Sequence, residues 1–406
     1  MNTGDTAWLL MSTALVMIML PGLALFYGGL VRRKNVLSTI MHSFFGLALV
    51  SIVWVVIGFT LAFGPDVNGL GLIGGLDFAM FNGVGQEPST VYATTIPFML
   101  FAMFQLMFAA ITPALISGAF AERKRFGAFV LFTVLWSIFV YSPIAHWVWS
   151  VDGWLFKLGA LDFAGGTVVH ASSGISALIV ALLIGRRVVN GDGLEPHDIP
   201  MTVLGAGLLW FGWFGFNAGS ATAANGLAAN ALLVTNIAAA AATISWVLLQ
   251  YINKKKVSVV GAACGAVAGL VAITPASGYV TAGGALVIGL LVGGICYSMT
   301  LLRSRLRIDD ALDVFAVHGV GGTFGAIATG VFASATVQAA YSGLLDGNPQ
   351  QLVTQAVAVV ATVAYAAVGT FVIVKVVDLV LGLRVAEKDE EVGLDLAVHG
   401  EAAYQA

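Results

Sequence analysis

The sequence predicts an all-α polytopic membrane protein with eleven transmembrane helices in a five-plus-five inverted repeat. Charged residues make up 10% of the 406 residues and hydrophobic residues 59%, whereas soluble domains carry about 25% charged residues. Nine long stretches contain no Asp, Glu, Lys or Arg, and the basic residues between them cluster in alternate connections. The bilayer is therefore the expected solvent for most of this chain.

Each uncharged stretch is long enough to span a bilayer, because a spanning helix needs roughly 20 apolar residues. Two stretches have room for two spans each: 199–253 divides near Asn217 to Asn225, and 257–302 divides near Pro275 to Gly284. Nine stretches therefore give eleven helices. In chain order the stretches are 6–31, 35–65, 88–121, 126–151, 163–185, 199–253, 257–302, 314–345 and 347–374.

The basic residues orient these helices, because Lys and Arg concentrate on the cytoplasmic side of membrane proteins. One set of alternating connections holds 16 of the 18 basic residues, while Lys157 lies in the opposite set and Lys375 inside the last span. We therefore expect a multi-pass protein of the cell inner membrane, with the N-terminus outside and the C-terminus cytoplasmic. The 16 residues are Arg32, Arg33, Lys34, Arg123, Lys124, Arg125, Arg186, Arg187, Lys254, Lys255, Lys256, Arg303, Arg305, Arg307, Arg384 and Lys388.

The ends and the small residues of the spans indicate one compact bundle without a soluble enzymatic domain. Met1 to Asp5 lack the basic n-region and cleavage site of a secretory signal, so the first span should remain as a helix. Cys264 and Cys296 lie in predicted spans and are interpreted as packing residues rather than a disulfide or metal site. Glycine accounts for 49 residues, against a usual share of about 7%, and small residues let membrane helices approach closely.

Two histidines in apolar stretches each follow an aspartate by eight positions: Asp162 precedes His170, and Asp310 precedes His318. Ionisable side chains inside the hydrocarbon layer are costly and normally mark the path of an ion, a proton or a substrate. The two helices run in opposite directions, which is the inverted-repeat plan that places a transport site near the midplane. His170 lies roughly 10 Å into its helix at 1.5 Å per residue, and His318 lies at a similar depth from the other face. We expect the two rings to meet near the centre.

Two alternative roles for this pair stay open from the residues alone. Each ring can donate one hydrogen bond to a neighbouring helix and serve only packing, or both rings can ligate a haem. The chain shows no haem-attachment motif and no further paired histidines. The other histidines fall near span ends or in polar segments and are interpreted as interface or surface residues: His42, His146, His197 and His399.

Aromatic residues gather in three of the predicted spans. Phe104 and Phe108 lie one helical turn apart in the third span, and Trp149 lies at the outer end of the fourth. Ring faces attract cations by about 2 kcal/mol or more in a desolvated site, which is enough to select a small cation at a pore entrance. Packing and membrane-interface roles are the alternative for these rings. The sixth span contributes Trp210, Phe211, Trp213, Phe214 and Phe216.

Four long segments resemble bacterial ammonium transporters of the Amt/MEP/Rh family, and they follow the family's order over nearly the whole chain. The tail elements Gly393-Leu-Asp395 and His399-Gly-Glu401 resemble the family's regulatory tail. We therefore expect a transmembrane transporter domain over 1–383 and a cytoplasmic regulatory tail over 384–406. The four segments are Pro21-Gly-Leu-Ala-Leu-Phe-Tyr-Gly-Gly29, Asp162-Phe-Ala-Gly-Gly-Thr-Val-Val-His170, Gly212-Trp-Phe-Gly-Phe-Asn-Ala-Gly-Ser220 and Asp313-Val-Phe-Ala-Val-His-Gly319.

The resemblance implies a homotrimer with one pore through each eleven-helix subunit. The chain departs from the family locally, because Ser150-Val151-Asp152 follows Trp149 where relatives commonly have glycines, and the loop to Asp162 is one residue longer. The resemblance assigns the external ammonium site to Trp149, Phe108 and Ser220, the stacked gate to Phe108 and Phe216, the pore lining to His170 and His318, and a structural or electrostatic role near the entrance to Asp162.

The residues also support a physical mechanism in which ammonium loses a proton and ammonia crosses. An unpaired charge in a narrow apolar pore costs far more than the neutral amine does. Imidazole titrates near neutral pH and has donor and acceptor nitrogens, so the histidines can bind ammonia and pass the proton. No cofactor, nucleic-acid partner or enzymatic activity is predicted, because the chain shows no nucleotide-binding loop or catalytic cluster. Potassium or carbon dioxide as the substrate stays open on composition.

The tail predicts a regulatory partner. In bacterial relatives the resembling tail packs on the cytoplasmic face and supports control by a PII-type protein, GlnK, although composition alone fits a solvated tail equally well. The expected partners are ammonium and ammonia, membrane lipid, two further copies of the chain and this PII-type regulator. The alternative function is an ammonium sensor that signals through a PII-type partner, but the chain ends at Ala406, so we expect no output domain.

Overall fold

Helices form nearly all of the regular structure in the computed structural model, which describes residues 1–188 and 193–404. In this part of the chain ten helices are long and apolar enough to cross a membrane, and α11 is a shorter apolar helix. The predicted all-helical membrane fold is confirmed, and the count of eleven is reached when α11 is included. The helices of the spans are α1 (Thr3–Leu30), α2 with α3 (Val36–Val53, Phe59–Phe63), α4 (Phe98–Ser117), α5 with α6 (Phe126–Trp136, Ser142–Trp149), α8 (Ser172–Ile184), α9 (Ile199–Gly219), α10 (Gly226–Lys254), α11 (Val259–Ile273), α12 (Ala282–Arg305), α13 (Gly321–Phe332) and α14 (Pro349–Leu381).

Local sequence sets the ends of several spans. The predicted divisions are present, because α9 ends at Gly219 before α10 begins, and α11 ends at Ile273 before α12 begins. The uncharged stretch 88–121 is longer than its helix, which starts at Phe98 after Pro97 in an extended conformation. A proline lacks the N–H that a helix interior requires and fits a helix start, so residues 88–97 form a loop instead.

Short helical elements fill the connections and interrupt some spans. Four are π-helical turns inside spans, and two of these, η6 and η7, lead into α8 and α13. π-helical turns are rare and occur often at functional sites. The short elements are η1 (Arg33–Asn35), η2 (Trp54–Gly58), η3 (Ala79–Phe81), η4 (Gly118–Phe120), η5 (Ser137–Tyr141), α7 (Trp154–Leu158), η6 (Gly166–Ala171), η7 (Phe315–Val320), η8 (Leu344–Asp346), α15 (Glu387–Val392) and η9 (Asp395–His399).

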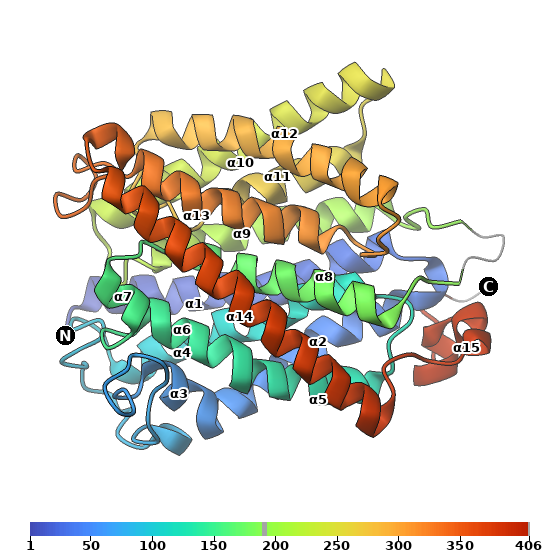
Figure 1. Cartoon of the computed structure of the whole chain (residues 1–406), viewed down its shortest axis with the longest axis horizontal. Helices are drawn as coiled ribbons and strands as arrows, with labels where there is room; N and C mark the ends of the chain where they lie inside the picture. The colour runs from blue at the N-terminus through green and yellow to red at the C-terminus, as the bar shows by residue number, and fades with distance from the viewer. Residues whose placement is uncertain (189–192, 405–406) are drawn as a thin grey trace.

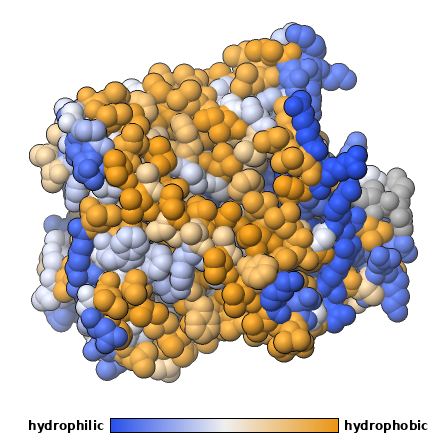
Figure 2. Space-filling view, viewed as in Figure 1, coloured by the Kyte–Doolittle hydropathy of each residue, from blue (hydrophilic) through white to orange (hydrophobic). Residues whose placement is uncertain are grey.

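The two ends of the bundle differ in charge. The connections that follow α1, α4, α8, α10, α12 and α14 lie at one end, on the right in Figure 1. These connections carry the 16 clustered basic residues, so we call this end the basic end. Figure 2 shows an apolar surface over the middle of the bundle and hydrophilic residues gathered toward the ends, most densely at the basic end. This is the distribution that a multi-pass membrane protein requires.

The helix packing repeats between the two halves of the chain. α1 packs on α2 and α4, α9 packs on α10 and α11, and α1 and α9 pack along each other. In the same way α8 contacts η7, while α13 contacts η6. Arg187, which follows the end of α8, pairs with Asp309, which precedes the start of η7. The end of one helix therefore lies beside the start of the other, and the two helices run in opposite directions. α14 crosses both halves and packs on α5, α8 and α13 (Figure 1).

Glycines allow the two π-helical turns to touch. A Cβ atom on Gly174 of α8 would overlap the backbone of Gly319, and one on Gly322 of α13 would lie 2.7 Å from the Cβ of His170 and 2.9 Å from the backbone N of Ala171. Small residues permit such close backbone approach between membrane helices. The glycine at each crossing therefore brings the two histidine-bearing turns into contact.

Candidate functional site

His170 and His318 contact each other between the two halves of the bundle, as the inverted Asp-His segments predict. They lie on η6 and η7, and their Nδ1 atoms are 3.3 Å apart. Both side chains are buried. A neutral imidazole carries one N–H, so one Nδ1 donates to the other and the second acts as acceptor. This direct contact leaves no room for an iron between the two Nδ1 atoms.

Asp162 closes the first turn of η6. Its Oδ1 accepts hydrogen bonds from the N–H groups of Gly165 at 2.8 Å and Gly166 at 2.6 Å. Its Oδ2 accepts from the N–H groups of Thr167 at 2.8 Å and Val168 at 3.2 Å, and from the Thr167 hydroxyl. Burial raises the pKa of Asp162, and these hydrogen bonds oppose that rise. Both carboxylate oxygens therefore serve the backbone of the turn that carries His170.

Asp310 occupies the equivalent place before η7 but is bound differently. Its Oδ2 accepts from the Phe315 N–H at 2.7 Å, whereas its buried Oδ1 has no hydrogen-bond partner among the described residues. Burial and the nearby Asp313 carboxylate raise the pKa of Asp310 to about 6. The two repeats thus share the position of the acid but not its environment.

A column of aromatic rings stands over the histidine pair. The His170 ring stacks on Trp213 with centroids 5.4 Å apart and on Phe216 with centroids 6.0 Å apart. Phe216 in turn lies against Phe108, with centroids 4.3 Å apart and an interplanar angle of 38°. These two phenylalanines are the pair that the family resemblance assigns to a gate. All four side chains are buried, so the rings close the path above the histidines.

A cavity of about 310 Å³ opens on the other side of this ring pair, at the end of the bundle opposite the basic end. Phe108, Trp149 and Ser220 all line this cavity, which we call the vestibule. The Trp149 Nε1–H donates to the backbone oxygen of Asp162 at 2.9 Å, which fixes the indole ring. The Ser220 hydroxyl donates to the backbone oxygen of Phe216 at 2.9 Å, so its lone pairs are free to accept. The structure therefore brings the three residues assigned to an outer site into one space.

A narrow lumen lies on the histidine side of the ring pair. The centre of a water molecule can occupy a volume of about 10 Å³ in this lumen. This is enough for about one water molecule. Among the residues that the structure describes, His170 and His318 are the ionisable ones in the lining of the lumen, and the other lining residues come mainly from α1, α4 and α9. Sequence reasoning missed these apolar residues because they resemble ordinary core residues: Met19, Leu23, Phe26, Ile111, Leu115, Leu209 and Val267.

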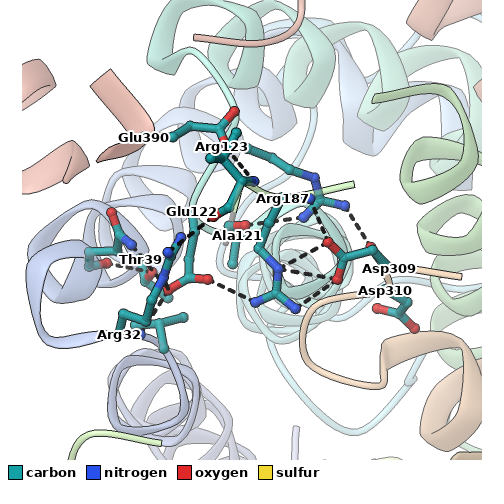
Figure 3. A network of polar contacts seen from close by, with 12 residues as sticks. Arg32, Thr39, Ala121, Glu122, Arg123, Arg187, Asp309, Asp310 and Glu390 are labelled. Atoms are coloured by element: carbon teal, nitrogen blue, oxygen red, sulfur yellow. Dashed lines mark hydrogen bonds and ion pairs between the residues drawn. The ribbon is translucent and has the colours of Figure 1, made fainter. Parts of the chain in front are cut away.

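A buried ion-pair network joins four connections at the basic end (Figure 3). Arg187 pairs with Glu122 at 2.8 Å and with Asp309 at 2.7 Å, and Glu122 also pairs with Arg32 at 3.0 Å. Burial acts to raise the pKa of Asp309, but the hydrogen bonds and charge of Arg187 outweigh it and hold the pKa at about 2. The pKa of Glu122 is likewise lowered, because Arg187 and Arg32 outweigh its burial. Arg187 and Asp309 also line a cavity of about 400 Å³ at this end.

The tail docks on the same end of the bundle. The Asp395 carboxylate accepts from the N–H groups of Leu37 and Ser38 at 3.1 and 2.9 Å, which caps the start of α2. The Glu390 carboxylate accepts from the N–H of Val188 at 3.1 Å, directly after Arg187 of the network. The segment predicted as a regulatory tail is therefore packed against the connections that surround the basic-end cavity.

Two predictions for histidines are corrected by the structure. His42 and His146 were expected at interfaces or the surface but are buried. His146 bonds Ala62 and Asp66, and the His42 ring packs on Phe129 with centroids 4.5 Å apart. Lys124 keeps its place in the connection after α4, but its side chain is buried, with Nζ 3.8 Å from the centroid of the Phe120 ring. Burial of these groups depends on helix packing, which leaves no local sequence signal.

No group of three or more His, Cys, Asp or Glu side chains is arranged to hold a metal ion within residues 1–188 and 193–404. The chemistry of the site therefore rests on the two imidazoles, the aromatic faces and a few hydroxyl and carbonyl oxygens. Such a set can hold a small cation in the vestibule and exchange protons and hydrogen bonds with a small neutral base in the lumen.

Comparisons with known proteins agree with this geometry. The sequence model of the Ammonium Transporter Family matches residues 7–404. A protein named ammonium transporter from Bacillus subtilis (strain 168) is 52% identical over 407 residues, covering 100% of this chain and 99% of that protein. The crystal structure of Saccharomyces cerevisiae Mep2 is similar with a TM-score of 0.89 and 38% identity, covering 95% of this chain and 88% of that one. A structure named Sensor Amt Protein also has a TM-score of 0.89, at 31% identity, covering 97% and 98% of the two chains.

Proposed function

The chain belongs to the ammonium transporter family, and from this premise we propose that it binds ammonium in the vestibule, removes one proton and conducts ammonia past His170 and His318. The observation that carries the proposal is the succession of vestibule, contacting ring pair and histidine-lined lumen along one path. Its relatives are named as transporters, and no enzymatic step on the substrate is needed.

The width of the lumen makes deprotonation the favourable route. A space for about one water cannot hold a hydrated ion, and the lumen walls are mostly apolar. A bare charge in such surroundings costs far more free energy than a neutral amine. Ammonia therefore crosses at lower cost than ammonium, and the imidazoles of His170 and His318 accept and pass on the proton.

The vestibule offers what a dehydrating ammonium ion requires. The faces of Phe108 and Trp149 attract a cation, and the free lone pairs of the Ser220 hydroxyl accept one of its N–H groups. The two rings meet nearly at right angles, with centroids 5.8 Å apart and an interplanar angle of 86°, so they bound the space on two sides. Phe108 and Phe216 must separate before the substrate enters the lumen, because their contacting rings fill the path.

The histidine pair presents one donor and one acceptor to ammonia. Because one Nδ1–H donates to the other Nδ1, the donating ring has a bare Nε2, and the accepting ring carries its single N–H on Nε2. The Nε2 of His170 is buried without a partner among the described residues. Ammonia has a lone pair and N–H groups, so it matches this pair of Nε2 atoms. The same arrangement can take up a proton at one ring and release it from the other.

Three further parts of the proposal concern the assembly. The basic end lies in the cytoplasm, because it carries 16 of the 18 Lys and Arg residues and such residues stay on that side. The protein then lies in the cell inner membrane with its N-terminus outside. Each pore belongs to one subunit of a homotrimer. A PII-type protein, GlnK, controls transport from the basic end, where the docked tail packs against the connections around the basic-end cavity.

An uptake assay in a cell that lacks its own ammonium transporters tests the proposed function. The wild-type chain should restore uptake, and His170→Ala and His318→Ala should lose selective uptake while the purified oligomer stays intact. Competition by potassium, rubidium and methylammonium measures the selectivity. Wild-type uptake by both variants, correctly inserted in the membrane, would remove the histidines from the conduction path.

A sensor is the second candidate function, because one similar structure is named Sensor Amt Protein. In this alternative, ammonium binding changes the docked tail and a PII-type partner reads the change without net transport. Pull-down of the purified chain with its cognate PII protein, in ATP, ADP or 2-oxoglutarate, measures this partner. Ammonium-dependent PII binding without uptake would favour the sensor, whereas uptake in the deficient cell favours the transporter.

A further inference from the structure

A second cavity adjoins the vestibule at the same end of the bundle. It has a volume of about 720 Å³ and lies between the loop connecting α3 to α4 and the residues that follow Trp149. Phe63, Val91, Tyr92 and Val151 line both spaces. The hydroxyl group of Tyr92 lies 3.0 Å from that of Ser150. We call this space the outer cavity.

One wall of the outer cavity is aromatic. Phe63 and Tyr92 meet at 85° with centroids 5.3 Å apart, and Phe78 and Phe98 meet at 77° with centroids 5.3 Å apart. Tyr92 also stacks on Phe98. All four residues line the cavity. Aromatic ring faces attract cations, so an aromatic lining of this kind favours a cationic ligand.

The lining of the outer cavity also carries negative charge. Glu87 and Asp152 line it, and none of the described residues on its wall is Lys, Arg or His. Lys157 lies 3.7 Å from Asp152, but both side chains are about half exposed, so this pair is well solvated. The loop is held in place, because the backbone oxygens of Gly85 and Glu87 accept from the N–H groups of Met99 and Phe98 at 3.0 Å. The cavity therefore combines a cation-attracting wall with an ordered, acidic loop.

The size of the outer cavity points to a ligand larger than ammonium. Ammonium is about the size of a water molecule, which occupies about 30 Å³ in the liquid, and it would leave most of the 720 Å³ empty. An alkylated ammonium ion fills more of the space with carbon atoms that pack on the rings. Its charge meets the two carboxylates. The contacting rings of Phe108 and Phe216 exclude such an ion from the lumen.

We propose that the outer cavity binds alkylammonium ions of about the size of choline, and that a bound ion obstructs the access of ammonium to the vestibule. The binding follows from the aromatic and acidic walls alone. The obstruction rests on the proposed transport function, because it presumes that ammonium reaches the lumen through the adjoining vestibule.

Isothermal titration calorimetry on the purified full-length protein in lipid nanodiscs tests the binding. Choline should bind with saturation, and its neutral isostere 3,3-dimethylbutan-1-ol should bind at least about tenfold more weakly, because it lacks the charge that the rings and carboxylates recognise. Absence of saturable choline binding, or equal binding of the alcohol, would overturn the proposal.

Variants place the site within the molecule. Glu87→Gln combined with Asp152→Asn should weaken choline binding at least about fivefold, and Phe78→Leu should weaken it while keeping an apolar wall. Asp77→Asn is the matched control, because Asp77 is exposed in the same loop but does not line the cavity. If the double variant does not fold, Phe78→Leu alone still tests whether choline binds in the outer cavity. Unchanged choline affinity in the folded variants would show that choline binds elsewhere.

Uptake measurements then test the obstruction. Choline should inhibit ammonium uptake by the wild-type chain, and its inhibition constant should rise in the same variants by the same factor as the dissociation constant. Choline binding without inhibition would overturn the obstruction. A chain that binds choline but takes up no ammonium would count against the transport function and leave the binding site standing, so the two failures are distinguishable.

Discussion

Replacement of Asp162 separates a capping role from direct cation binding. Both oxygens of this buried carboxylate accept hydrogen bonds from the first turn of η6, four from backbone N–H groups and one from the Thr167 hydroxyl. The first N–H groups of a helix have no partner inside the helix. Asp162→Ala leaves these four donors buried without an acceptor, whereas Asp162→Asn keeps one acceptor oxygen.

The hydrogen-bond count sets the expected size of each effect. A buried donor that loses its partner costs about 1–3 kcal/mol. Taking the lower value for each N–H, Asp162→Ala lowers the free energy of unfolding by about 4 kcal/mol. Asp162→Asn keeps the bonds from Gly165 and Gly166 if its oxygen takes the place of Oδ1, and it loses those from Thr167 and Val168. Its expected cost is about 2 kcal/mol.

Denaturant unfolding in detergent and ammonium uptake per folded protein are the two measurements. Capping predicts that stability falls in the order wild type, Asp162→Asn, Asp162→Ala, and that folded Asp162→Asn retains uptake. Asp77→Ala, at an exposed aspartate of the same end, should change stability by no more than about 0.5 kcal/mol. A fully stable Asp162→Asn without uptake would refute capping as the main role, as would an Asp162→Ala as stable as wild type.

Three more predictions follow from buried polar groups. Arg187→Met removes the ion-pair partner of Asp309 and one of the two ion-pair partners of the buried Glu122, so it should lower the free energy of unfolding by about 3–5 kcal/mol, measured by denaturant at neutral pH. Asp310→Asn should gain stability over wild type as pH rises from about 4 to about 6. The pKa of Asp310 in the folded state is about 6 against an ordinary value of 3.8, so its ionisation disfavours the folded state. Parallel unfolding titrations of the two proteins should show no such change in their stability difference below about pH 4. Gln105→Leu should raise the KM for ammonium about fivefold without lowering the maximal rate. Gln105 lines the vestibule, and its buried Oε1 has no partner among the described residues, so this oxygen can accept a hydrogen bond from ammonium. An unchanged KM in uptake kinetics would contradict this prediction.

The sequence predicts the histidine contact because two independent constraints meet there. Charged residues are so scarce that the spans can be counted, and the count places His170 and His318 on helices of opposite direction. Equal spacing from an aspartate then puts both rings at similar depth. Their 3.3 Å contact depends in addition on Gly174 and Gly322, which the composition shows only as two of many glycines.

Other parts of the site carry no comparable signal in the sequence. The π-helical form of η6 and η7 is set by packing and capping around each turn rather than by residue type. The outer cavity depends on a long loop that the uncharged stretch 88–121 conceals, because residues 88–97 lack charge yet fold outside the helix. The lumen is lined by apolar residues from helices distant in the chain. Only tertiary packing selects such residues from the many others like them.

The two aspartates show how an inverted repeat can keep its backbone and change its chemistry. Asp162 and Asp310 each precede their histidine by eight positions in the sequence. Each also accepts a hydrogen bond from a backbone N–H of the turn that follows. Asp162 has both oxygens occupied, so its carboxylate is fixed to the backbone. Asp310 has one oxygen unpartnered and lies near Asp313, which raises its pKa to about 6. A carboxyl group with that pKa exchanges protons near neutral pH, so the repeat retains a structural acid near the vestibule and a titratable one at the basic end.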